Sequence, residues 1–177
     1  MVEITYQMVL STLQTVGVLV GIIYYITIMR NADKNRKYQI AQQISQEVQS
    51  RENSLIAIEL LEMEWEDFDD FLRKYDSTVN KDNYSKRVMI FAMIAQVGYS
   101  LKQGDIDIET LYNLLPSHGS LQIWNKFKPI LMEQRKRYND PHWYRWFEYY
   151  ADEIMKERVR QGLPADITDP DAHARTA

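Results

Sequence analysis

One long uncharged segment near the N-terminus limits what this chain can fold into. From Ile4 to Met29 the sequence contains no charged side chain. As an α-helix this run would be roughly 39 Å long at about 1.5 Å per residue. About 20 apolar residues suffice to cross a hydrocarbon core of about 30 Å. Because lipid offers the backbone no hydrogen-bonding partner, a lone spanning segment has to be helical. The sequence therefore predicts a transmembrane helix over residues 4–29.

The charges on either side of this segment predict its orientation. Residues 1–3 carry only Glu3 and the terminal amine, whereas the segment after it carries Arg30, Lys34, Arg36 and Lys37 against Asp33. Basic flanks stay on the cytoplasmic side of a membrane. We therefore expect a single-pass protein of the cell membrane, with residues 1–3 outside and the remainder in the cytoplasm. A cleaved signal peptide is the main alternative, but the apolar run is too long and lacks a basic start and a small-residue cleavage site.

One face of the predicted transmembrane helix differs from the others. Gly17 and Gly21 form a GxxxG pair, which lets another helix backbone approach closely, and Gln14 lies about one turn away. Gln14 is long enough to hydrogen-bond across such a contact. Such pairs also arise by chance, because Gly is common in membrane helices. The alternative to chance is self-association or docking on another membrane subunit through Gln14, Gly17 and Gly21.

Beyond the membrane segment the sequence is typical of long helices. No Gly or Pro occurs between Gly21 and Gly98, and few breakers favour helices over many short strands. We predict an all-α chain with a helical stalk over residues 30–60, a four- to five-helix bundle over 61–162 and a flexible tail over 163–177. Arg51 falls on the apolar seam of the stalk, which argues against a true coiled coil. The chain has no Cys, which excludes disulfides and thiolate metal sites.

Capping and breaking residues predict where the helices of the bundle begin and end. Predicted starts lie at Asn80 or Asp82, Asp107, Ser120, and Asp140 with Pro141; predicted ends lie at Gly104, Pro116 and Gly162. Pro129 lacks an N–H and would clash with the preceding turn. It therefore predicts a kink or a break near Lys128.

An acidic segment over residues 62–70 could suggest a metal site. Its acidic side chains, however, lie on the helix face opposite Leu61, Trp65 and Phe68. None of the three His residues completes a Glu-x-x-His motif. The spacing instead favours ion pairs from Asp69 to Arg73 and from Asp70 to Lys74. We interpret the segment as a solvated acidic face, without a metal or cofactor.

Two further clusters permit more than one interpretation. Trp143, Trp146, Phe147, Tyr150 and Ile154 share one helical stripe, which favours a bundle core over a base-stacking platform. A basic stretch contains Lys126, Lys128, Arg135, Lys136 and Arg137. Near a membrane it could contact anionic lipid, or it could be a solvated face. The net charge of −4 argues against nucleic acid as a partner for the chain as a whole.

Several segments resemble a known family. WEDFDDFLRKYD, LKQGDIDIETLY and the region from Ile123 to Lys156 are similar to uncharacterised single-span membrane proteins of prokaryotes and archaea that are grouped as a domain of unknown function. The most specific parts are the W-x-K-F-K-P run at Trp124–Pro129 and the N-D-P sequence at Asn139–Pro141. The resemblance implies a membrane-anchored helical domain and supplies no activity, ligand or site residue.

The function indicated by these features is non-enzymatic. We find no P-loop, Gly-rich fingerprint or nucleophile elbow, and therefore no catalytic residue to name. The leading hypothesis is a membrane-anchored interaction or regulatory module whose partners are the bilayer and either a protein or a second copy of the chain. One alternative is an accessory subunit of a larger membrane complex, docked through its transmembrane helix. A second is a membrane-bound enzyme, or a binder of anionic lipid or nucleic acid through residues 126–137.

Overall fold

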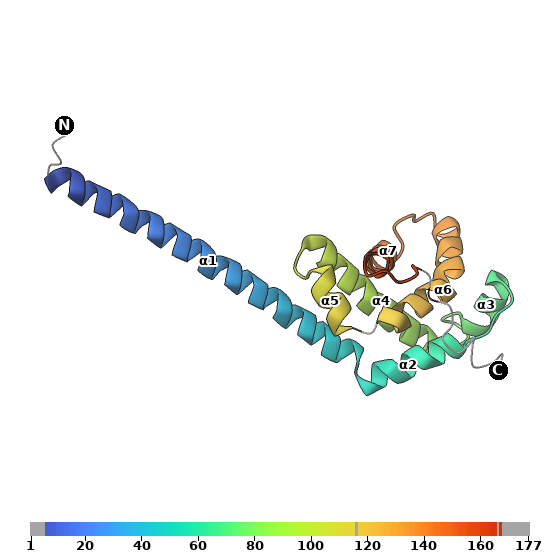
Figure 1. Cartoon of the computed structure of the whole chain (residues 1–177). Coiled ribbons are helices and arrows are strands. Elements are labelled where there is room, and N and C mark those ends of the chain that lie inside the picture. The colour runs from blue at the N-terminus through green and yellow to red at the C-terminus, as the bar shows by residue number, and fades with distance from the viewer. Residues whose placement is uncertain (1–5, 116, 166, 168–177) are drawn as a thin grey trace. The chain divides into compact units, whose positions relative to one another are not determined.

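A computed structural model describes residues 6–115, 117–165 and 167. In these ranges all regular structure is helical, which confirms the all-α prediction. The helices in chain order are α1 (Tyr6–Val48), α2 (Arg51–Glu62), α3 (Phe68–Tyr75), α4 (Lys81–Gln103), α5 (Ile108–Leu114), α6 (Ser117–Arg137) and α7 (Arg145–Arg160) (Figure 1). Contacts divide the chain into one unit up to Gln39 and a second unit from Ile40 onward. The predicted external residues 1–3 lie outside the described ranges.

Within the described residues, the first unit consists of α1 as far as Gln39. Every residue from Tyr6 to Arg36 is exposed. The most apolar 18-residue window has a mean hydropathy of 1.8, and none of it is buried. Threonine hydroxyls at Thr12, Thr15 and Thr27 donate to backbone carbonyls four residues earlier, over 2.7–2.8 Å. The hydroxyls are thus paired within the helix, and α1 is long and apolar enough to span a membrane.

The second unit begins with the last turns of α1. Ala41 is buried there, and Ile44 and Val48 pack against the core. The helix ends before Ser50, whose side chain caps α2 by accepting a hydrogen bond from the Asn53 backbone N–H (3.2 Å). The end of α1 is also attached to α5, because the side chains of Ser45 and Gln49 both donate to the Leu114 carbonyl at 3.0 Å.

The centre of the second unit is the close packing of α4 against α7. Gly98 makes this possible, because a Cβ there would lie 2.0 Å from the Trp146 carbonyl oxygen. Around this contact the core is aromatic, with Phe91, Phe127 and Phe147 among its buried rings. The Phe91 ring meets the Phe127 ring at 5.1 Å and the Phe147 ring at 5.5 Å, within the range of favourable aromatic pairs.

Several helix boundaries agree with the predictions. Asn80 caps α4 by accepting from the Asn83 backbone N–H (3.0 Å), and Asp107 caps α5 by accepting from the Thr110 backbone N–H (2.8 Å). Gly104 ends α4 with a φ of 78°, a left-handed conformation that suits a residue without a Cβ.

The boundaries of α6 and α7 differ from the predictions. The helix α6 already begins at Ser117, so Ser120 lies inside it and is not its cap. It also continues through Pro129 without a break, and a kink near Lys128 stays a prediction. Phe127 and Leu131 are both fully buried on either side of Pro129. Their packing outweighs the local cost of the missing hydrogen bond.

The last helix begins later than predicted. Asp140 and Pro141 are followed by turns, and α7 starts only at Arg145. The preceding residue, Tyr144, has a φ of 51° and so turns the chain in a left-handed conformation. Its ring meets the Phe91 ring at 5.5 Å. The start of α7 therefore follows this tertiary contact and not the local helix-start sequence at Asp140 and Pro141.

The described residues beyond α7 pack against the rest of the second unit. Ile167 is buried, and the Arg158 side chain donates from Nε to the Pro164 carbonyl at 2.9 Å. Most of the predicted flexible tail over 163–177 lies outside the described residues.

Candidate functional site

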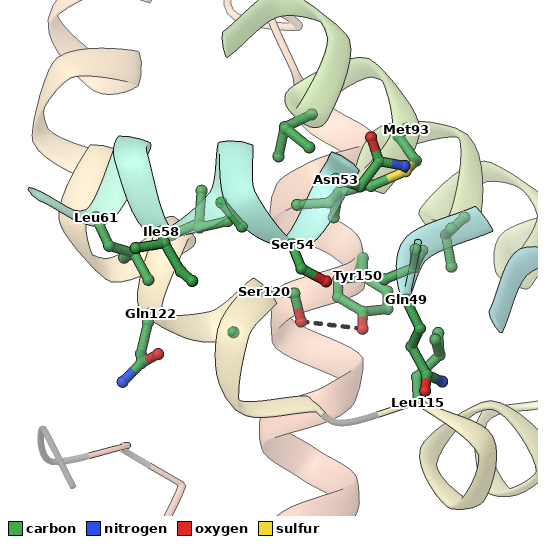
Figure 2. Close-up of a pocket in the computed structure, with 17 residues that line it drawn as sticks. Gln49, Asn53, Ser54, Ile58, Leu61, Met93, Leu115, Ser120, Gln122 and Tyr150 are labelled. Carbon is green, nitrogen blue, oxygen red and sulfur yellow. Dashed lines mark hydrogen bonds between the residues drawn. The ribbon is translucent and has the colours of Figure 1, made fainter. Parts of the chain in front are cut away.

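A cavity of about 300 Å³ lies in the second unit (Figure 2). It is bordered by the end of α1 and by α2, α4, α6 and α7. Its wall is largely aliphatic and includes Ile58, Leu61, Ile90, Met93, Val97 and Ile123. Pockets that bind small molecules have this character, with an apolar lining and a few well-placed polar groups.

The polar groups of the cavity are uncharged. They belong to Gln49, Asn53, Ser54, Ser120, Gln122 and Tyr150. Among the described residues that line it there is no Asp, Glu, Lys, Arg or His. The cavity therefore offers hydrogen bonds but no charge to balance that of an ionic group.

A hydroxyl pair joins two helices at the cavity wall. The hydroxyl oxygens of Ser120 in α6 and Tyr150 in α7 lie 3.1 Å apart. Figure 2 shows the Ser54 hydroxyl of α2 directed toward the same pair. Burial raises the pKa of Tyr150 above its ordinary value, so the phenol is neutral at physiological pH.

Two of the amide side chains at the cavity, Asn53 and Gln49, are held in place by hydrogen bonds. Asn53 donates from Nδ2 to the Glu47 carbonyl (2.7 Å) and to the Met93 sulfur (3.6 Å). Gln49 donates from Nε2 to the Ser45 hydroxyl (2.6 Å). These bonds connect the start of α2 to the end of α1 and to α4, and they fix one border of the cavity before anything binds.

The acidic side chains Glu62, Glu66 and Asp69 are exposed, as expected of a solvated face, but the segment is not one continuous helix. The chain leaves helical geometry between α2 and α3, where Asp67 caps α3 by accepting from the Asp70 backbone N–H (2.7 Å). The predicted pair of Asp70 and Lys74 forms at 2.8 Å, but Asp70 itself is buried. Hydrogen bonds from Lys74, from the Glu66 backbone N–H and from Arg73 lower the pKa of Asp70.

The other predicted ion pair of this segment is wrong. Asp69 pairs with Arg137 of α6 at 2.9 Å, while Arg73 pairs with Asp70 at 3.1 Å. Within the described ranges, no group of three or more His, Cys, Asp or Glu side chains is placed to hold a metal ion.

The five basic residues of the stretch 126–137 contact different neighbours. Lys126 donates to the Leu61 carbonyl and lies 5.3 Å from the Trp65 ring centre, and burial lowers its pKa. Arg135 binds Glu148 of α7 at 2.7 Å. The others contact Trp124 (Lys128), Glu133 (Lys136) and both Asp69 and Glu133 (Arg137). Four of the five thus engage protein carboxylates or carbonyls, and their binding of lipid or nucleic acid stays a prediction.

The three residues of the predicted helix-contact face lie on the exposed first part of α1. Gln14, Gly17 and Gly21 are all exposed. A Cβ built on Gly17 or Gly21 meets no heavy atom within 4 Å. The surface beside both glycines is therefore open to a second helix, and docking there stays a prediction.

Sequence reasoning did not identify the cavity. It assigned Ser120 to a helix cap and Tyr150 to a core stripe, and both assignments follow from local patterns. A cavity forms where side chains of five helices fail to fill a space, and one sequence carries no local signal for that. Asn53 and Ser54 follow the polar residues Arg51 and Glu52 in the sequence, so their context gives no such signal either.

The chain belongs to a known family of unassigned function. The sequence profile of a family described as a domain of unknown function (DUF4760) matches residues 11–154, which is most of the chain. The match includes much of α1, the helices around the cavity, and the Ser120 and Tyr150 hydroxyls. No curated protein and no solved structure gave a significant match.

Proposed function

We propose that this chain is a membrane-anchored interaction module without catalytic activity of its own. In this proposal α1 crosses the cell membrane with its N-terminus outside, and the second unit lies in the cytoplasm. The observation that carries the proposal is α1 itself. It has an uncharged apolar segment whose side chains are all exposed, joined in one chain to a helical unit that has its own core.

The exposed apolar surface of α1 supports membrane insertion physically. Burying apolar surface is worth about 25 cal/mol per Å², so a helix of this kind would be unstable in water without a cover. A lipid bilayer provides that cover and also fits the length of the segment. The basic residues that follow Met29 support the cytoplasmic placement of the second unit.

The partner of the module is proposed to dock on the face formed by Gln14, Gly17 and Gly21. Small residues at helix contacts in membranes allow close packing and backbone contacts between helices. The open space beside both glycines is consistent with such a contact. The partner is either a second copy of the chain or a different membrane subunit, in which case the chain is an accessory subunit.

Chemical crosslinking in native membranes tests this docking face. The double substitution Gly17→Ile and Gly21→Ile should reduce the crosslinked product at least fivefold, because branched side chains would hold the two helices apart. The mass of the product distinguishes a second copy from another subunit. Leu19→Ile is the matched control, since Leu19 lies on the opposite side of the helix, and it should leave the product unchanged. If the double variant crosslinks like the wild type, this face is not the interface.

A further inference from the structure

The cavity has the dimensions of a small-molecule site. Its volume of about 300 Å³ is at the lower end of the range of about 300–1,000 Å³ for ligand pockets. If each non-hydrogen atom takes about 30 Å³, the volume of a water molecule in the liquid, roughly ten such atoms would fit. Ser54 and Ile58 at the border of the cavity are exposed, so the space is open to solvent. A ligand with an apolar part would bury the aliphatic side chains of the wall and remove their surface from water.

The lining determines the charge of that ligand. An ion that enters an apolar site loses its hydration and requires an opposite charge or several hydrogen bonds in return. The described wall of the cavity contains amide and hydroxyl groups but no ionisable side chain other than Tyr150, a phenol that is neutral at physiological pH. A carboxylate, phosphate or ammonium ligand would therefore bind poorly, and a neutral one is favoured.

The hydroxyl pair determines where a polar group of the ligand would lie. A hydroxyl has two lone pairs besides its proton, so the Tyr150 oxygen can accept a hydrogen bond from a third group while it is paired with Ser120. The rest of the wall is aliphatic, with Ile58, Ile90 and Met93 on different helices. A ligand with one polar group could therefore bond to the Tyr150 oxygen while its hydrocarbon part contacts this aliphatic wall.

We propose that this cavity binds a neutral, mainly aliphatic molecule that carries one hydroxyl or amide group, with that group hydrogen-bonded at Tyr150. The site is distinct from the docking face on α1, and the proposal does not depend on where the second unit lies in the cell. Membrane anchoring and the binding of this ligand can therefore succeed or fail separately.

Titration with 1-octanol tests the proposal on the full chain. The chain would be placed in lipid nanodiscs with ¹³C-labelled methionine methyl groups. The methyl signal of Met93, which lines the cavity, should shift and saturate as the free octanol concentration rises. The signal of Met132, which belongs to the same unit but not to the cavity wall, should not show a saturable shift. Octanoate at neutral pH has the same chain with a charged end, and it should bind at least about tenfold more weakly.

Two variants that fill the cavity test whether octanol enters it. Ala57→Leu adds bulk at the wall, and Gly119→Leu does so at a position where an added Cβ meets no heavy atom within 4 Å. Each should abolish the saturable shift of Met93 while the protein stays folded. Ala92→Leu, the same change as at Ala57 but on the exposed side of α4, should leave octanol binding as in the wild type.

The hydroxyl pair has its own test. The double substitution Ser120→Ala and Tyr150→Phe should weaken octanol binding about three- to tenfold, the effect of losing one neutral hydrogen bond. Any of four results would overturn the proposal. These are no saturable shift at Met93 in a folded chain, octanoate binding as tightly as octanol, octanol binding that persists in both filled variants, or unchanged octanol affinity in the variant that lacks both hydroxyls. The last result would assign the cavity to a hydrocarbon chain instead.

Discussion

Gly98 is the residue on which the packing of α4 against α7 depends most directly. An added Cβ would lie 2.0 Å from the Trp146 carbonyl oxygen and 3.1 Å from the Tyr150 Cβ, so the two helices would have to separate. Gly98→Ala should therefore lower the free energy of unfolding by about 1–3 kcal/mol, as overpacking of a core does. All four Trp residues lie in the second unit, so urea unfolding followed by tryptophan fluorescence measures this unit alone.

Gly119→Ala is the matched control for Gly98→Ala. It makes the same change inside a helix, but at a position with open space around the new Cβ. Because Ala is favoured over Gly in helices, this variant should be as stable as the wild type or up to about 1 kcal/mol more stable. Equal stability of the two alanine variants would show that α4 and α7 do not meet as closely as described.

Asp70 should make the stability of the second unit depend on pH in the acid range. Hydrogen bonds from Lys74 and from the Glu66 backbone lower its pKa below the ordinary value of 3.8. A carboxyl whose pKa is lower in the folded state stabilises the fold fully above its unfolded pKa, and this contribution is lost as the pH falls toward the folded pKa. We expect the urea midpoint to fall below about pH 4. In Asp70→Asn this fall should be smaller; an identical fall in the variant would assign the acid dependence to other groups.

Local spacing predicts contacts within one helix turn better than contacts between helices. The Asp70–Lys74 pair was predictable because both residues lie in α3, four positions apart. The burial of Asp70 and the pairing of Asp69 with Arg137 were not, because they depend on where α6 lies. The same limit applies to the cavity, whose hydroxyl pair joins residues 30 positions apart.

At the scale of the elements, Arg135 connects α6 to the start of α7. Its Nε donates to the Trp143 carbonyl at 2.9 Å, and its guanidinium binds Glu148 at 2.7 Å. Arg135→Met would leave both acceptors without this donor and should lower the free energy of unfolding by about 1–3 kcal/mol. The same urea unfolding experiment measures this effect.

Lys128 provides the control for Arg135 within the same helix. It is exposed, and its described contact is with the Trp124 ring at 5.9 Å. Lys128→Met should therefore change stability by no more than about 0.5 kcal/mol. If Arg135→Met changes the free energy of unfolding as little as Lys128→Met does, Arg135 does not connect the two helices. The basic stretch is then better regarded as one solvated surface.

Helix boundaries were predictable where a local cap forms and not where packing determines them. Asn80, Gly104 and Asp107 act as their sequence predicts, because a cap involves only neighbouring backbone groups. The start of α7 instead follows the contact of Tyr144 with Phe91. The continuation of α6 through Pro129 depends likewise on buried neighbours such as Phe127.

For the whole molecule, the long apolar helix is the feature that could be predicted best. Its prediction rests only on the absence of charge from Ile4 to Met29, which is a matter of composition. The structure gives this segment as one exposed helix, long and apolar enough to cross a membrane. The cytoplasmic location of the second unit is inferred only from the basic residues after Met29. This location is the central claim of the proposed function.

Labelling of single cysteines in intact cells tests that claim most directly, because the chain has no native Cys. Glu3→Cys places a thiol before α1, and Gln103→Cys places one at an exposed position at the end of α4. A membrane-impermeant maleimide should label Glu3→Cys in intact cells and should label Gln103→Cys only after the cells are permeabilised. Labelling of Gln103→Cys in intact cells would contradict a cytoplasmic second unit.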